Sequence, residues 1–239
     1  MKGTWAIFKK DLYLFLLTPS SYLSISAVFI ALSTLFFNQF FLLGQSSLPS
    51  LFHLMSWFFV FIIPALSMGS WSEEKQEDTM ALLFGLPLST LSLILGKYLA
   101  QFCQVLLFIL ISLPIPIMLI QISDPDFGPI ISGYLGIIFL ALFHLAHGQF
   151  FSSLTRHPIL AYCLSSITAL LFMGLSHQLL QYQLPVPIAK FLFEMGLAPH
   201  FNRLVNGVIS LKQCCYFIGY ILGFLSLTWT SLEIQRQRP

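Results

Sequence analysis

The feature that most constrains this chain is the stretch from Leu12 to Ser72, which contains no Asp, Glu, Lys or Arg. A transmembrane helix needs about 20 predominantly apolar residues, so this stretch is long enough for more than one span. Over the whole chain 57% of the residues are hydrophobic and 8% are charged, whereas soluble domains carry about 25% charged residues. The sequence therefore predicts an all-α integral membrane protein.

Apolar runs separated by short polar segments predict six membrane spans. The predicted spans are residues 21–43, 51–71, 91–122, 130–154, 158–182 and 213–232. Segments 44–50 and 124–129 hold the residue types that favour turns, and Pro64 is expected to kink the second span. Residues 183–212 contain four charged residues and three prolines, so we expect short outer helices there instead of a span.

The first 18 residues carry too much charge to span and predict a helix that lies in the membrane interface. An apolar stripe recurs there at spacings of three and four, formed by Trp5, Phe8, Leu12 and Phe15. Three lysines lie to one side of the stripe, at Lys2, Lys9 and Lys10. Basic side chains in that position favour contact with anionic lipid head groups.

The distribution of basic residues predicts the orientation of the chain. Six spans place both termini on one side. With the termini inside, the cytoplasmic basic residues are Lys2, Lys9, Lys10, Lys75, Lys97, Arg156, Arg236 and Arg238, and the outer ones are Lys190, Arg203 and Lys212. This asymmetry agrees with the excess of Lys and Arg in cytoplasmic loops.

A charged segment joins the second and third predicted spans. Five of the six residues from Glu73 to Asp78 are charged, and each would cost about 2.5–3.5 kcal/mol in hydrocarbon, so this segment lies in water. We expect Ser72 to cap one amphipathic helix over 72–84, and Ser89 or Thr90 to cap the next. The candidate contacts to a soluble partner are Glu73, Glu74, Glu77, Asp78, Met80, Leu83 and Phe84. An ordinary solvated loop is the alternative.

The sequence offers little chemistry of its own. The Gly96-Lys97 pair lacks the upstream glycine and the following Ser or Thr of a phosphate-binding loop. Scattered basic residues give no surface for nucleic acid, and we expect no cofactor. The four cysteines have no metal-ligand spacing and are interpreted as small apolar packing residues: Cys103, Cys163, Cys214 and Cys215.

Three further patterns leave alternatives open. Paired glutamates at 73–74 occur in intramembrane proteases, but the arginine those enzymes need four residues after the second glutamate is replaced by Asp78. His144 and His147 share one helix face, which suits a metal or proton site or, by default, hydrogen bonds between helices. Gly219 and Gly223 permit close helix contact, either within the chain or between two copies.

Residues 73–79, followed by Leu82-Leu83, 86–89 and 95–97, resemble the loop between the second and third spans of ABC-2 type transporter permeases. In that family the loop forms the coupling helix against the ATPase subunit, and a glycine often stands where this chain has Asp78. A narrower resemblance, to the gliding-motility-associated permease branch, covers nearly the whole chain. It is carried by Lys10-Asp11, 18–22, 126–129, 133–136, 152–156, His200-Phe201, Arg203, 207–209 and Tyr216-Phe217.

The resemblance implies a single ABC-2 type permease domain over 1–239, similar to the type V exporters, in a bacterial inner membrane. Two such halves, identical or related, would form the pathway above two cytoplasmic ATPase subunits. An auxiliary subunit with an extracytoplasmic domain often accompanies this branch. The alternative is a non-transporting complex that transmits force to an envelope partner, with an intramembrane enzyme third. The sequence indicates no substrate.

Overall fold

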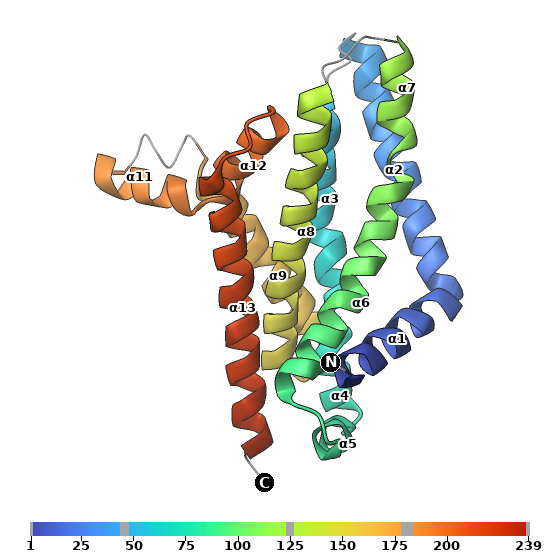
Figure 1. Cartoon of the computed structure of the whole chain (residues 1–239). Helices are drawn as coiled ribbons and strands as arrows, with labels where there is room; N and C mark the ends of the chain where they lie inside the picture. The colour runs from blue at the N-terminus through green and yellow to red at the C-terminus, as the bar shows by residue number, and fades with distance from the viewer. Residues whose placement is uncertain (1, 44–47, 123–126, 178–183, 238–239) are drawn as a thin grey trace.

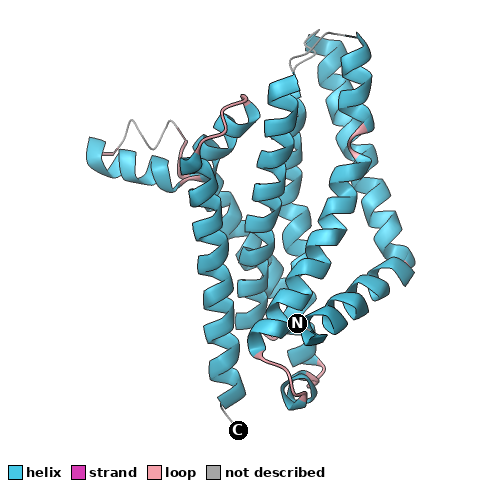
Figure 2. Cartoon of the chain, in the orientation of Figure 1, coloured by secondary structure: helices cyan, strands magenta, loops and turns pink. Residues whose placement is uncertain are grey.

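The computed structural model describes residues 2–43, 48–122, 127–177 and 184–237. All the regular elements in these ranges are helices (Figure 2). The predicted turns at 44–50 and 124–129 lie partly outside the described residues. The end of the fifth predicted span, at 178–182, lies wholly outside them.

The helices follow one another along the chain as α1 (Lys2–Leu17), α2 (Pro19–Leu43), α3 (Leu48–Ser67), α4 (Gly69–Gln76), α5 (Met80–Gly85), α6 (Thr90–Ile111), α7 (Pro114–Ile122), α8 (Phe127–Leu154), α9 (Pro158–Gly174), α11 (Val186–Met195), α12 (Leu197–Val205) and α13 (Leu211–Gln237). The short helices expected over 183–212 are present as α11 and α12.

Five helical stretches are long and apolar enough to cross a membrane. They are Ser21–Phe41, Leu48–Gln76, Thr90–Gln121, Phe127–Leu154 and Leu211–Gln237. Five of the six predicted spans therefore have a matching helix. The sixth match, α9, is apolar but has 17 residues, at the lower limit of about 17–25 for a span. A sixth crossing there stays a prediction.

Two of these long stretches are interrupted near a proline. The helix that contains Pro64 ends at Ser67, and α4 resumes after Met68, whose N–H still donates to the Pro64 carbonyl at 2.8 Å. In the predicted span 91–122, α6 ends at Ile111 and α7 begins at Pro114. Proline has no N–H to donate and its ring crowds the preceding turn, which explains why α7 begins as a separate helix at Pro114.

Helix α8 is the centre of the bundle because small residues let its neighbours approach closely. Gly133 lies directly against the Phe52 ring of α3, and Gly148 lies against the Ser67 side chain at the end of that helix. A Cβ at either glycine would collide with these groups. The main apolar core accordingly forms where α8 meets α3, α12 and α13.

The helices place the two chain termini at one end of the molecule, beside α4 and α5, with α11 and α12 toward the other end (Figure 1). Helix α1 crosses α6, and Ile7 of α1 packs so closely on Gly96 that a Cβ there would lie 2.9 Å from it. The residues of the predicted stripe on α1 are exposed or partly buried: Trp5 is 64% exposed and stacks on Phe8, whereas Ile7, outside the stripe, is buried.

Candidate functional site

The segment between the second and third predicted spans forms two short helices. The predicted single helix over 72–84 is wrong at both its start and its middle. Helix α4 begins at Gly69, and the Ser72 hydroxyl donates to the Met68 carbonyl instead of capping a helix end. Asp78 has a φ of 54°, in the left-handed region that favours glycine, and α5 begins only at Met80.

The end of the segment follows the sequence prediction. Helix α5 ends at Gly85, shortly before Pro87. Ser89 is the N-cap of α6, and its hydroxyl oxygen accepts a hydrogen bond from the Ser92 N–H at 3.3 Å. This is the usual way to satisfy a free N–H group in the first turn of a helix. The segment is thus closed by a defined cap and leads directly into the next span.

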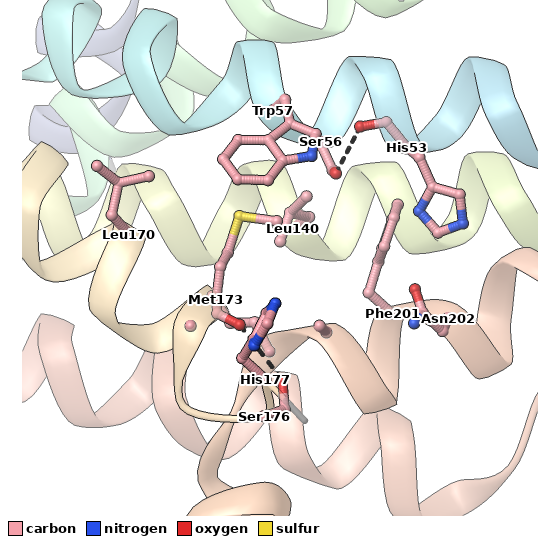
Figure 3. Close-up of a pocket in the computed structure, with 13 residues that line it drawn as sticks. His53, Ser56, Trp57, Leu140, Leu170, Met173, Ser176, His177, Phe201 and Asn202 are labelled. Atoms are coloured by element: carbon pink, nitrogen blue, oxygen red, sulfur yellow. Dashed lines mark hydrogen bonds between the residues drawn. The ribbon is translucent and has the colours of Figure 1, made fainter. Parts of the chain in front are cut away.

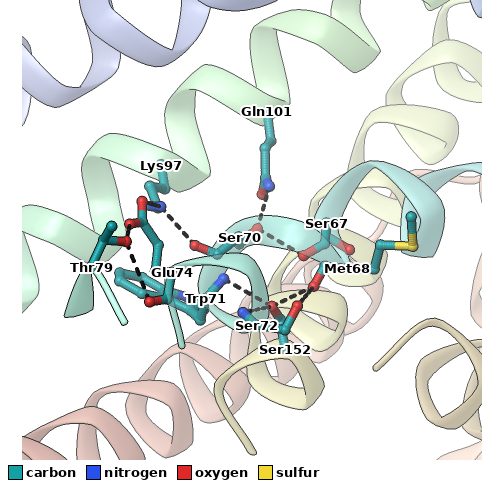
Figure 4. A network of polar contacts seen from close by, with 10 residues as sticks. All are labelled: Ser67, Met68, Ser70, Trp71, Ser72, Glu74, Thr79, Lys97, Gln101 and Ser152. Carbon is teal, nitrogen blue, oxygen red and sulfur yellow. Dashed lines mark hydrogen bonds and ion pairs between the residues drawn. The ribbon is translucent and has the colours of Figure 1, made fainter. Parts of the chain in front are cut away.

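A buried serine of α8 joins the start of α4 to the bundle (Figure 4). The Ser152 hydroxyl oxygen accepts from the Trp71 N–H at 2.9 Å and from the Ser72 N–H at 3.1 Å, and it donates to the Met68 carbonyl at 2.7 Å. The first N–H groups of a helix lack partners inside that helix. One side chain of α8 therefore supplies hydrogen-bond partners to backbone groups at the break between α3 and α4.

A lysine of α6 forms the second connection. Lys97 is almost wholly buried, and its ammonium donates to the Ser70 carbonyl at 2.6 Å and to the Glu74 carboxylate at 3.0 Å. The same ammonium lies 5.0 Å from the centre of the Trp71 ring. Gln101, one turn further along α6, donates to the Ser70 hydroxyl and accepts from Gln149 of α8 at 3.0 Å.

The C-terminal end of α13 forms the third connection. Thr90 at the start of α6 donates to Glu233 at 2.7 Å, and Arg236 donates to the Leu88 carbonyl at 3.3 Å. The Ser153 carbonyl, at the end of α8, accepts from Lys75 of α4 and from Gln235 of α13. The segment 69–90 is thus tied by polar contacts to α6, α8 and α13.

Helix α5 has an inner and an outer apolar side. The predicted contacts Met80, Leu83 and Phe84 are partly buried and pack against a small cluster that includes Trp71 and Leu232. The outward apolar residues are Leu82, which is 74% exposed, and Leu86, which is 44% exposed. Sequence periodicity identified Met80, Leu83 and Phe84 as one apolar face. It does not tell whether such a face packs on the chain itself or contacts a partner.

The predicted acidic contacts are also divided. Glu73, Glu77 and Asp78 are exposed. Glu74 is engaged within the chain, by Lys97 and by the Thr79 hydroxyl. The sequence interpretation missed the two side chains of α6 that bind α4: Lys97, which contacts Glu74, and Gln101, which contacts Ser70. The available signal was a lysine and a glutamine one helical turn apart in an apolar run, since polar groups at such positions must find partners.

The two histidines of α8 are buried among aromatic rings. His147 shares a hydrogen bond between Nε2 and the Thr168 hydroxyl of α9 at 2.8 Å, which confirms the default interpretation of a bond between helices for this residue. It is not confirmed for His144, whose two ring nitrogens have no hydrogen-bond partner among the described residues. The ring of His144 meets Phe143 edge to face. Within the described parts of the chain, no group of three or more His, Cys, Asp or Glu side chains is placed to hold a metal ion.

A cavity of about 440 Å³ opens between α3, α8, α9 and α12, away from the segment 69–90 (Figure 3). Its walls combine Trp57 and Phe201 with polar side chains such as His53 and Asn202. The His53 and Phe201 rings meet edge to face with their centres 6.0 Å apart. The sequence interpretation did not identify this cavity, because its residues come from four separate helices.

The predicted glycine pair of α13 faces outward. A Cβ added at Gly219 or Gly223 would meet no atom within 4 Å. Both glycines line an apolar groove of about 440 Å³, with Tyr216, Tyr220 and Leu227 along it. Among the described residues the pair therefore serves no internal helix contact, and the groove remains available for another chain.

Comparison with known proteins agrees with this architecture. A family model described as ABC-2 family transporter protein matches residues 44–179, which include the segment 69–90 and the central helix α8. No curated protein matches the chain. Because the matched region is more than half of the sequence, this multi-pass membrane protein belongs to the ABC-2 family of transporter proteins.

Proposed function

We propose that this chain is the permease half of an export-type ABC transporter, with 69–90 as the segment that receives motion from a separate cytoplasmic ATPase. The observation that carries the proposal is the two-sided character of this segment. Its outer side presents Leu82 and Leu86, and its inner side is fastened to the bundle by buried polar contacts. The family supports a transporter membrane component that is not itself catalytic.

The inner contacts make the segment suitable for transmitting a displacement. Moving α4 away from α6 would separate the Lys97 ammonium from Glu74 and from the Ser70 carbonyl. Leaving such buried groups unpaired is costly, so α6 follows α4 at lower cost than it separates from it. The same reasoning applies to α8 through Ser152. A push on α5 would thus move several spans together, as in rigid-body switching.

The orientation with both termini in the cytoplasm of a bacterial inner membrane completes the proposal. The structure has both termini and the segment 69–90 at one end (Figure 1), and the basic residues concentrate in the same parts of the sequence. Within the family, we propose the gliding-associated branch, with its auxiliary extracytoplasmic subunit. This finer assignment rests on the sequence resemblance alone.

Two permease halves are proposed to form the complete pathway. One chain of this size forms a single bundle, and the groove over Gly219 and Gly223 is open and apolar. Small residues at a helix surface allow close packing of a second membrane helix. The second half would be a copy of this chain or a related permease.

The docking role is tested by replacing the outer apolar residues of α5. The Leu82→Ser/Leu86→Ser variant is expected to retain less than a fifth of the ATPase subunit on co-purification, because buried apolar anchors dominate such interfaces. Leu211→Ser is the matched control, an exposed leucine at the start of α13 toward the other end.

Replacements on the inner side complete this test. Phe84→Ala is expected to weaken ATPase retention more than Glu77→Ala, because Phe84 packs against the bundle and positions α5, whereas a rim charge mainly affects the association rate. Undiminished ATPase recovery and ATP turnover in both the Leu82/Leu86 variant and a Met80/Leu83/Phe84 triple alanine variant would remove the coupling assignment.

Force transmission without transport is the second candidate. It is favoured by α11, which extends away from the bundle and exposes Val186 and Phe191 (Figure 1). An exposed apolar helix in this position suits an envelope partner. Movement of a substrate into or out of proteoliposomes that contain the complete complex would support transport. Its absence, with ATP turnover intact and dependent on the envelope partner, would support force transmission.

A further inference from the structure

Helices α1 and α2 form an open hairpin (Figure 1), and residues of both helices line two neighbouring cavities. A polar cavity of about 340 Å³ is lined by charged and amide side chains of α1, α4 and α6. An apolar cavity of about 400 Å³ extends between α2, α3 and α6, along Ile25, Val28 and Ile62. The two cavities share five lining residues: Phe15, Ala65, Leu66, Glu73 and Gln104. The two cavities therefore adjoin across these residues, one of them polar and the other apolar.

The charges in the polar cavity fall into two sets. The Lys97 ammonium and the Glu74 carboxylate lie 3.0 Å apart as an ion pair, and their charges cancel. The remaining groups are one cation, Lys10, and two carboxylates, Asp11 and Glu73. Within the described residues these three side chains form no ion pair closer than 4.0 Å.

Burial changes the pKa of one of these groups, Asp11. The pKa of the Asp11 carboxyl is raised from its usual value by burial, which outweighs the opposing effect of the Lys97 and Lys10 ammonium groups. A bound cation near this carboxylate would relieve that cost, because an opposite charge favours the ionised form. Glu73 lines both cavities and so stands where they adjoin.

We propose that the adjoining cavities bind one phospholipid with a zwitterionic, primary-amine head group, of the phosphatidylethanolamine kind. Lys10 would contact the phosphate, Glu73 and Asp11 would contact the ammonium, and an acyl chain would lie along Val28 and Ile62. The lipid belongs to the cytoplasmic leaflet in the proposed orientation. The binding itself depends neither on that orientation nor on ATPase coupling.

The charges in the polar cavity favour a zwitterionic head group over an anionic one. An anionic head group without an amine would satisfy Lys10 but leave its net charge facing two carboxylates. In a zwitterionic head group, the negative phosphate can pair with Lys10 and the positive ammonium can pair with the two carboxylates. Retention of lipid that merely surrounds the protein would not depend on the side chains between α1, α4 and α6. Substitution of these residues therefore distinguishes a specifically bound lipid from surrounding lipid.

Native mass spectrometry of the delipidated full chain tests the proposal. The protein is offered phosphatidylethanolamine and phosphatidylglycerol with identical acyl chains at equal concentration. One retained phosphatidylethanolamine per chain, at least fivefold over phosphatidylglycerol, is expected. Glu73→Lys should reverse the preference by removing the ammonium acceptor at the junction. Lys10→Gln should reduce retention of both lipids, because both carry the phosphate.

Two further variants check the fit. Lys9→Gln makes the same charge change on the same helix at an exposed residue that does not line either cavity, and should retain lipid as the unaltered chain does. Val28→Trp should fill the apolar cavity and reduce retention of both lipids. Equal retention by every variant, or a preference of the unaltered chain for phosphatidylglycerol, would overturn the proposal. Lys10 and Glu73 are exposed at the surface, so their variants are expected to keep the melting temperature of the parent chain, which is measured in parallel.

Discussion

At the scale of single residues, Ser152 has more consequence than its size suggests. It is fully buried, and its hydroxyl group serves three backbone groups on either side of the break between α3 and α4. Removing one partner from buried polar groups costs more than the average value of a hydrogen bond, because each remaining group loses water without gaining a replacement.

Ser152→Ala is therefore expected to destabilise the protein by about 2 kcal/mol, since the Trp71 and Ser72 N–H groups lose this partner, while the Met68 carbonyl keeps the Ser72 hydroxyl. The measurement is the melting temperature of the detergent-solubilised chain. Ser226→Ala is the matched control, because the exposed Ser226 hydroxyl donates only to the Gly223 carbonyl of its own helix. A melting temperature of Ser152→Ala equal to that of the control would contradict the assignment.

Asp78 shows what a sequence reveals about one position. The resemblance to permeases marked it as a place where glycine is common, and its φ of 54° supplies the reason. Aspartate tolerates this conformation better than most residues. The helix break itself was not predicted, because the surrounding residues are good helix formers and the break depends on one backbone angle.

At the scale of elements, the short helices α11 and α12 are held to α13 by a stacked histidine. The His200 and Tyr216 rings lie nearly parallel with their centres 3.9 Å apart, and His200 Nε2 is 3.0 Å from the Glu194 carbonyl. Burial lowers the pKa of His200, and it outweighs the opposing effect of Glu194, while Lys212 and Arg203 lower the pKa further. The folded chain therefore binds a proton at His200 less readily than the unfolded chain does.

The sign of the pH dependence follows from this difference. Where the unfolded state binds more protons, stability rises with pH, so the His200 contribution is lost as the pH falls below the usual histidine pKa of about 6.5. His200→Phe keeps a ring against Tyr216 and cannot be protonated. Its melting temperature, relative to the unaltered chain, should rise as the pH is lowered from 8 to 5.

An exposed histidine provides the control for this measurement. His157→Phe makes the same replacement at an exposed histidine, the N-cap of α9, and is measured over the same pH range. If His200→Phe and His157→Phe follow the same course, His200 is not the group responsible.

Elements differ in how well they could be predicted. The long apolar runs set the bounds of α2, α8 and α13 to within a few residues, because water excludes such runs regardless of their neighbours. The start of α4 could not be predicted, since it depends on Ser152, which is distant in sequence. The side of α1 that packs on the bundle was not predicted either, because Ile7 lies against Gly96 of α6, which is distant in sequence.

At the scale of the whole molecule, the arrangement of the ends gives a direct test of orientation. Gln76 and Val186 are both exposed, at the end of α4 and the start of α11. In a chain whose four native cysteines are replaced by alanine, Gln76→Cys should resist an impermeant thiol reagent added from outside the cell. Val186→Cys should react. Labelling of Gln76→Cys in sealed cells would reverse the proposed orientation.

The attachment of the α13 end to the α5–α6 connection has a genetic consequence. A nonsense codon at position 233 would spare every predicted span but delete Glu233, Gln235 and Arg236, which hold Thr90, Ser153 and Leu88. Such a truncated product would still insert and still occupy its place beside a full-length copy, with one receiving segment loosened. In a paired assembly, that allele would behave as dominant, whereas loss of the whole gene would behave as recessive.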